Sequence, residues 1–273
     1  MSRLSNIPNQ ARRRHMSIAL VFGTSHTGPY VRGHRLARAK NLVGYDVHGM
    51  VFHGDRYEPQ IQNLPGRGLH FNPKMAEDIG TAIKQLNPSC LITAVMGSGY
   101  WTSGMTRHVR PFDFLVPELS GHPLTQETEM IPYALMQRRF YTDLDWQFSI
   151  VRDVQELSDL PILNLEAPPP VESEELMLKG IAQHGPTMAS LEEHGLPSVS
   201  FRYKLWWGWT EVTRRISADL GLHYVTGPPN TRDAAGFLDK KFYSDGLHAS
   251  DEYGRLMALE VERVMRDTGI PVQ

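Results

Sequence analysis

The chain has 273 residues, of which 41% are hydrophobic and 21% charged, and these values are typical of a globular protein rather than of a disordered or fibrous one. The formal net charge of -2 at pH 7 gives no electrostatic reason to expect a nucleic acid or an anionic membrane as a partner. This balance favours a small neutral substrate.

The first residues, Met1 to Met16, include several arginines but no apolar stretch long enough for the core of a signal peptide. An Arg-rich start is also compatible with a transit peptide, although a plain flexible tail fits so short a segment better. No apolar run approaches the ~20 residues that cross a bilayer. The single cysteine, Cys90, lies in an apolar run, predicts a buried side chain and excludes an intrachain disulfide. We therefore expect a cytoplasmic protein with a flexible tail over residues 1–15 and one domain over residues 16–273.

Short apolar runs bounded by Gly, Pro or Asn predict buried strands. In chain order these runs are Ile18 to Phe22, Asp46 to Phe52, Leu91 to Met96, Pro161 to Leu165 and His223 to Val225.

Helical patterns lie between these strands. Asn72 and Pro73 form a helix start, and apolar residues then recur on one face as far as Leu86. A second stripe, which includes Trp206 and Trp209, runs from Leu205 to Leu220 and ends at Gly221. The last helix begins at Ser250, carries acidic residues in its first turn and ends near Arg266. The basic residues from Arg32 to Lys40 indicate one more helix with a solvated face.

This alternation of strands and helices implies an α/β fold: a mainly parallel, five-stranded sheet with helices on both faces, in a flavodoxin-like arrangement. Reactive residues in such folds lie at the carboxyl ends of the strands. Both Ser25, after the first strand, and His248, before the last helix, are compatible with that edge.

Two short strings carry the chemistry. Gly23-Thr24-Ser25-His26 closes the first apolar run with a small-residue turn that holds one hydroxyl in position to be a nucleophile. Asp245-Gly246-Leu247-His248 places a carboxylate three residues before an imidazole. A serine attacks an acyl carbon only when an imidazole takes its proton, and a carboxylate fixes the tautomer of that imidazole. The strings together therefore predict an acyl-transfer site.

Each string has a plainer interpretation. Ser25 or Thr27 can cap a helix, Asp245 can cap a turn, and a lone histidine before a helix is usually a satisfied polar residue. Their joint occurrence, in this order and at these element ends, favours catalysis.

Gly-Thr-Ser-His after the first strand and Asp-Gly-Leu-His before the last helix resemble the SGNH, or GDSL, hydrolase superfamily, in a subgroup with a Gly-x-Ser-His motif. The resemblance spans about Met16 to Val264 and implies a three-layer α/β/α esterase, lipase or deacetylase. It implies that Ser25 is the nucleophile, His248 the base and Asp245 its orienting partner, with the backbone N–H of Ser25 in the oxyanion hole. Further matching strings are Arg110-Pro111-Phe112-Asp113-Phe114, Pro117-Glu118, Ile131-Pro132-Tyr133, Pro168-Pro169-Pro170 and Gly236-Phe237-Leu238.

The chain departs from the superfamily pattern at two places. Thr24 stands where Asp or Asn usually precedes the serine, a mainly structural position. Ser98, after Gly97, stands where an Asn normally donates to the oxyanion, and removing one such donor commonly costs ~10²- to 10³-fold in turnover. Gly66 and Gly68 are candidates for the glycine of the second sequence block.

The remaining aromatic and histidine residues suggest pocket walls and core rather than metal ligands. Trp101, just after Ser98, is a pocket candidate, whereas the spacing of Trp206 and Trp209 indicates core. The 12 histidines form no His-x-x-x-His pair and no Cys/His cluster, so we expect neither a metal nor a cofactor. We expect His26 to line the pocket or the surface.

The sequence thus predicts a serine-dependent hydrolase of a small acyl ester, on a sugar or a secondary metabolite. Two alternatives stay open: an acyltransferase that uses the same acyl-enzyme, and a non-catalytic binding protein that keeps the fold but has lost efficient oxyanion stabilisation at Ser98.

Overall fold

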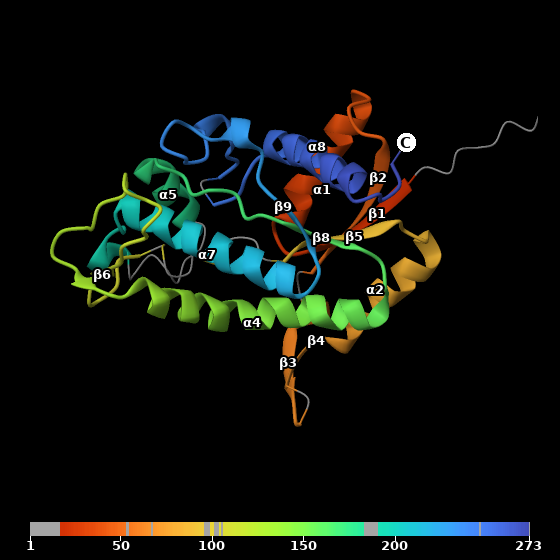
Figure 1. Ribbon diagram of the computed structural model, residues 1–273, viewed down its shortest axis with the longest axis horizontal. Coiled ribbons are helices and arrows are strands. Elements are labelled where there is room, and N and C mark those ends of the chain that lie inside the picture. Colours follow the sequence, from red (N-terminus) through yellow and green to blue (C-terminus); the bar gives the residue numbers. More distant parts are fainter. Residues whose placement is uncertain are drawn as a thin grey trace, which may run out of the picture.

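A computed structural model describes residues 17–52, 55–66, 68–95, 99–100, 104, 106–182, 191–245 and 247–272. Its central feature is a five-stranded sheet in the order β2-β1-β5-β8-β9, in which every pairing is parallel (Figure 1). The strands are β1 (Ser17–Gly23), β2 (Tyr45–Val51), β5 (Cys90–Ala94), β8 (Ile162–Leu165) and β9 (His223–Val225). The prediction of a five-stranded, mainly parallel sheet is confirmed.

Helices cover both faces of this sheet and make three layers (Figure 1). On one face, α1 (Thr27–Ala39) packs against α8 (Asp251–Asp267). On the other face lie α2 (Pro73–Leu86), α4 (Tyr133–Leu157) and α7 (Val199–Asp219), and α4 contacts both α2 and α7. A separate cluster of buried apolar side chains lies on each face of the sheet. The inner strands of the sheet are therefore covered on both faces.

The predicted helix starts are confirmed at atomic detail. The Asn72 side chain accepts a hydrogen bond from Lys74 N at the start of α2, and the Ser250 side chain accepts one from Tyr253 N at the start of α8. Helix α7 begins earlier than its apolar stripe suggested, because the Ser198 side chain caps it by accepting from Phe201 N.

Several elements were not predicted. The longest helix, α4, lies between predicted elements, and α5 (Glu174–Ile181) follows the Pro168–Pro170 string. Short strands pair as β6 (Phe112–Asp113) with β7 (Glu129–Met130). Single 3₁₀ turns occur at η1 (Asp55–Tyr57), η2 (Pro229–Thr231) and η3 (Lys240–Phe242).

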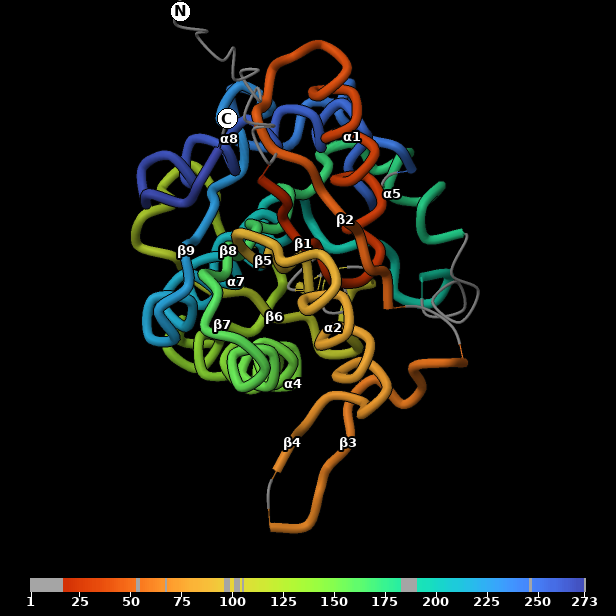
Figure 2. Tube along the Cα trace, turned by 90° about the vertical axis from the view of Figure 1, so that its right-hand side faces the viewer, coloured from red at the N-terminus to blue at the C-terminus, as the bar shows by residue number. Residues whose placement is uncertain are grey.

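An antiparallel hairpin of β3 (Ile61–Leu64) and β4 (Gly68–Phe71) projects from the body of the molecule (Figure 2). Its base is held to α4 by Asp153, whose carboxylate accepts from Phe71 N at 2.7 Å and contacts His70 Nδ1 at 2.8 Å. The tip turns at Gly66 and Gly68, which have φ of 74° and 84°. A positive φ is a backbone conformation that glycine adopts without strain, and the turn therefore accounts for both residues.

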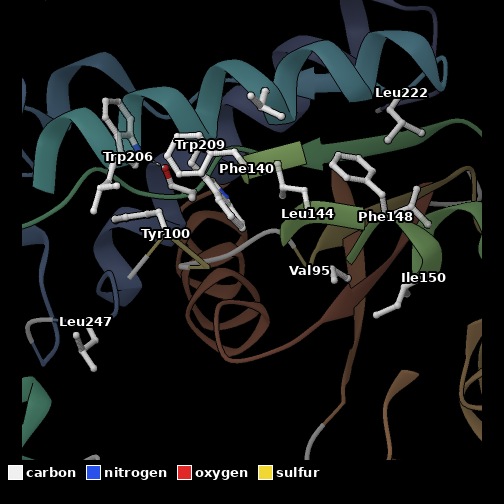
Figure 3. Close-up of a cluster of buried hydrophobic side chains, with 14 of the residues drawn as sticks. Val95, Tyr100, Phe140, Leu144, Phe148, Ile150, Trp206, Trp209, Leu222 and Leu247 are labelled. Carbon is white, nitrogen blue, oxygen red and sulfur yellow. Dashed lines mark hydrogen bonds between the residues drawn. The ribbon is translucent and has the colours of Figure 1, made fainter. Parts of the chain in front are cut away.

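Aromatic side chains fill the core beneath α7 (Figure 3). Trp206 and Trp209 are 1% and 2% exposed, which confirms that they are core residues, and the Trp206 indole donates to Ala167 O at 2.9 Å. Cys90 is buried at the start of β5, as predicted.

A buried ion pair fastens the β6 strand to α7. Lys204 Nζ lies 2.6 Å from Asp113 Oδ1, and both side chains are fully buried. Asp113 also accepts from the backbone N–H groups of Phe114 and Thr125, so its charge is compensated from three directions.

Within the described residues, no helix is both long enough and apolar enough to cross a bilayer.

Candidate active site

Ser25 lies in the tight turn that joins β1 to α1. β1 ends at Gly23, the Thr24 carbonyl accepts from Thr27 N at 3.1 Å, and α1 begins at Thr27. A Cβ at Gly23 would lie 2.8 Å from the backbone carbon of Ala94 on β5, so the turn needs a glycine where the two strands meet. The turn therefore leaves the half-buried Ser25 at the carboxyl edge of the sheet.

Asp245 and His248 form a hydrogen-bonded pair in the loop before α8. His248 Nδ1 lies 2.8 Å from Asp245 Oδ2, and the two side chains are 23% and 29% exposed. The other carboxylate oxygen, Oδ1, accepts from Leu247 N at 3.0 Å and from His248 N at 2.7 Å. Asp245 therefore holds both the backbone of this turn and the imidazole ring.

These contacts set the ionisation of Asp245. Partial burial on its own would raise the pKa of the carboxyl group, but the hydrogen bonds from the His248 ring and from the two backbone N–H groups together hold that pKa below its usual value. The carboxylate is charged near neutral pH, so the N–H at His248 Nδ1 donates a hydrogen bond to it. His248 Nε2 is then the ring nitrogen that is available as a base.

The structure brings the Ser25 turn and the Asp245–His248 loop together. The rings of His26 and His248 lie 5.3 Å apart between centroids and are tilted by 51°. Because His26 directly follows Ser25, this contact places the Ser25 turn beside the Asp245–His248 pair. The prediction that these strings form one site agrees with this arrangement.

His26 is an uncharged neighbour of the pair. Burial lowers the pKa of His26 to about 3, with a further lowering by the charge of His248 and a smaller opposite effect of Asp245. Its side chain also lines a small cavity of about 30 Å³ between α1, α8 and the ends of β5 and β8. His26 thus lines this cavity, and it adds no second cation beside His248 near neutral pH.

Helices α1 and α8, which follow the Ser25 turn and the Asp245–His248 loop, pack closely against each other. A Cβ on Gly33 would lie 2.3 Å from the backbone of Gly254, and a Cβ on Gly254 would lie 2.3 Å from the Pro29 carbonyl oxygen. Arg32 Nε also pairs with Asp251 at 3.0 Å. The helix after Ser25 and the helix after His248 are therefore in backbone contact, a feature that the sequence analysis did not identify.

The proposed oxyanion residues have different outcomes. Gly97, Ser98 and Trp101 lie outside the described residues. Gly66 and Gly68 lie at the exposed tip of the β3–β4 hairpin, where a Cβ at either position would meet no atom within 4 Å. This hairpin is a separate sheet from the one that carries Ser25, so the placement does not support an oxyanion role for either glycine.

Described residues on either side of residues 96–98 contact other parts of the fold. β5 ends at Ala94, paired with Gly23. A Cβ on Gly99 would lie 2.4 Å from the Trp209 ring, and the Tyr100 hydroxyl donates to Pro168 O at 3.0 Å. β5 thus ends beside the Ser25 turn, whereas Gly99 packs against α7 and Tyr100 is hydrogen-bonded to the segment after β8.

Among the residues that the structure describes, no group of three or more His, Cys, Asp or Glu side chains could hold a metal ion.

No protein-family model and no curated protein sequence matches the chain. Solved structures do resemble it. One is a GDSL-like lipase from Bacteroides thetaiotaomicron, with 9% identity over 93% of this chain and 89% of that chain, and a TM-score of 0.45. Another is the periplasmic domain of a lipopolysaccharide acetyltransferase from Salmonella ser. Paratyphi A, with 11% identity over 93% of this chain and 84% of that one, and a TM-score of 0.48.

A third is a gut microbial diltiazem-metabolizing enzyme, with 11% identity over 92% of this chain and 47% of that chain, and a TM-score of 0.45. The first of these neighbours is described as a GDSL-like lipase, and a further one as a putative acylhydrolase. At these identities the likeness concerns the fold alone.

Proposed function

We propose that this protein is a serine-dependent hydrolase of a small acyl ester, with Ser25 as nucleophile, His248 as base and Asp245 as the residue that orients the base. The observation that carries the proposal is the Asp245–His248 hydrogen bond of 2.8 Å, in a loop whose imidazole contacts the residue after Ser25. A charged carboxylate on Nδ1 leaves Nε2 as the acceptor that such a reaction needs.

In the proposed reaction, Ser25 Oγ attacks the carbonyl carbon of the ester while His248 Nε2 takes the hydroxyl proton. The tetrahedral intermediate collapses, the C–O bond to the alcohol breaks, and His248 returns the proton to the leaving oxygen. Water then attacks the acyl-Ser25 ester with His248 again as base, and the acid and free Ser25 are released. Asp245 stabilises the imidazolium in both halves.

The oxyanion would be bound by the backbone N–H of Ser25 and by the Ser98 hydroxyl. If Ser98 donates to the developing charge, Ser98→Ala should lower kcat by up to ~10²-fold with little change in KM, because the interaction strengthens only in the transition state. Wild-type kinetics in Ser98→Ala would remove Ser98 from this role.

The decisive experiment compares Ser25→Ala with Ser120→Ala, a change at an exposed loop serine. Turnover of an aryl acetate and stoichiometric labelling by a fluorophosphonate should both be lost in Ser25→Ala and retained in Ser120→Ala. Both variants should unfold at the wild-type temperature, because neither hydroxyl is buried in the core. Undiminished turnover in Ser25→Ala would refute the proposal.

The same reagents separate the alternatives. A non-catalytic binding protein would show no labelling of Ser25 in the wild type. An acyltransferase would be labelled but would give an acylated product only when an alcohol or amine acceptor is added, since the acyl-enzyme is shared and only the exclusion of water differs.

A further inference from the structure

A second pocket lies at the carboxyl edge of the sheet, beyond β8 and β9. Its volume is about 370 Å³, which is within the range of small-molecule sites. Its walls come from Glu166 after β8, from Gly227 and Arg232 in the loop after β9, and from Trp207, Thr210 and Arg214 on α7. Glu166 also lines the small cavity that His26 lines, so this residue is common to both cavities.

The charges in this pocket are balanced within the protein. Arg232 Nη2 lies 2.6 Å from Glu166 Oε1, and Arg214 Nη1 donates to Glu211 Oε1 at 2.5 Å. Arg214 Nη2 lies 3.9 Å from the second oxygen of Glu166. Both lining cations are therefore matched by a lining carboxylate, and a ligand that carried a net charge would have to disrupt one of these pairs.

Three residues that line the pocket carry buried polar atoms that have no hydrogen-bond partner among the described residues. Thr210 is only 5% exposed, and its hydroxyl has no hydrogen-bond partner among the described residues. In the same part of the structure, the Trp207 indole N–H and the Arg232 Nε–H are also buried and unpartnered. Such groups destabilise a protein unless water or a ligand pairs with them. Two of the three are donors only, so the matching ligand must present several acceptor atoms.

The apolar part of the pocket is aromatic. Trp206 and Trp207 lie at 69° to each other with centroids 6.5 Å apart, and the Arg232 guanidinium covers the Trp206 ring at 4.9 Å. Trp206 is buried under α7 (Figure 3), which leaves the half-buried Trp207 as the ring that a ligand can contact. A ligand with an apolar C–H face and several oxygen atoms around its edge would satisfy both the ring and the donors.

We infer that this pocket binds one neutral, hydroxyl-rich ring of the pyranose type. Hydroxyl oxygens would accept from Trp207 Nε1 and Arg232 Nε, and a hydroxyl would exchange a hydrogen bond with Thr210. The Arg214 side chain is 48% exposed and lies at the outer rim of the pocket, where the ring would enter. If the proposed hydrolase function holds, this ring is a sugar unit of the ester substrate, bound along the same sheet edge as Ser25.

Saturation-transfer NMR measures binding to the wild type and to Ser25→Ala. The ligands are methyl glucopyranoside, methyl galactopyranoside, methyl mannopyranoside and N-acetylglucosamine. At least one sugar should bind with a dissociation constant on the order of 1 mM, and equally to both proteins. Thr210→Val and Trp207→Phe each remove one hydrogen-bonding group and leave an apolar side chain in its place, so each should weaken binding by about three- to tenfold. Trp146→Phe, at a 37% exposed tryptophan of α4, is the matched control and should bind like the wild type.

The outcomes distinguish this inference from the proposed function. Sugar binding in a protein that hydrolyses no ester supports the pocket and refutes the hydrolase. Hydrolysis without saturable sugar binding refutes the pocket, whose polar groups are then satisfied by water. Binding that is unchanged in both Thr210→Val and Trp207→Phe, or saturable binding of adenosine but of none of the sugars, also overturns the inference.

Discussion

The substitution Asp245→Asn tests the role of the carboxylate with almost no change in side-chain shape. The new amide would keep a carbonyl oxygen to accept from the backbone N–H groups of Leu247 and His248, which now bond to Asp245 Oδ1 at 3.0 and 2.7 Å. The amide N–H would then face His248 Nδ1, which the Asp245 carboxylate contacts at 2.8 Å. Two donors cannot pair, so His248 Nδ1 must become the acceptor and Nε2 must carry the proton.

A histidine in that tautomer cannot take a proton from Ser25. The same carboxylate-to-amide change in a serine triad lowers kcat by about 10⁴-fold with the geometry intact, and we expect a loss of this order. Stability should hardly change, because the backbone hydrogen bonds of the turn remain. Asp245→Ala instead leaves both N–H groups to solvent, and we expect it to cost a further ~1 kcal/mol of unfolding free energy.

The assay measures kcat for an aryl acetate and the urea midpoint of unfolding for the wild type, Asp245→Asn and Asp245→Ala. The exposed His48→Gln on β2 controls for a change at a polar residue away from the site. The reasoning is refuted if Asp245→Asn retains kcat within tenfold of the wild type, or if it unfolds as readily as Asp245→Ala.

Three further changes address stability and packing. Lys204→Met leaves Asp113 buried without its cation and should lower the unfolding free energy by about 3–5 kcal/mol, measured by urea unfolding. Burial lowers the pKa of His34 to about 4, so between pH 6.5 and 4 the unfolded chain binds a proton that the folded chain does not. Stability should therefore fall as pH falls, by up to ~1.4 kcal/mol per pH unit from this group, and His34→Gln should reduce that slope. Gly99→Ala places a methyl group 2.4 Å from the Trp209 ring and should cost about 1–3 kcal/mol in urea unfolding.

Each of these expectations can fail clearly. A Lys204→Met protein as stable as the wild type would show that the ion pair is not needed. An unchanged pH slope in His34→Gln would assign acid sensitivity to other groups. An unperturbed Gly99→Ala would mean that the loop after β5 can shift away from α7.

The sequence predicted the elements whose patterns are local. The five strands are short apolar runs between turn residues, and the starts of α2 and α8 carry the capping residues Asn72 and Ser250, so each could be identified without knowledge of its neighbours. The pairing of the Ser25 turn with the Asp245–His248 loop followed from the rule that strand ends gather at one edge.

Not every missed element lacks a local signal. The buried apolar residues Met136, Phe140, Leu144, Phe148 and Val151 of α4 recur at helical spacing, so this helix was open to prediction from the sequence. Gly66 and Gly68 have positive φ in a hairpin turn, and the sequence alone does not distinguish such a turn from an oxyanion loop, because both favour glycine. The second pocket combines residues from the end of β8, from α7 and from the loop after β9, and none of them forms a motif along the chain.

The contact between α1 and α8 has a consequence for when the proposed site can assemble during synthesis. Arg32 and Asp251 are separated by 219 residues, and the two glycines that let these helices touch lie about as far apart in the chain. If the proposed mechanism holds, a nascent chain can form β1 and the Ser25 turn early but has no base for the serine until the helix after His248 has emerged and docked. Docking across so long a separation is an entropically costly and slow step. The serine should thus stay chemically silent until the fold is closed, and pulse-labelling of stalled chains with a fluorophosphonate would show when reactivity begins.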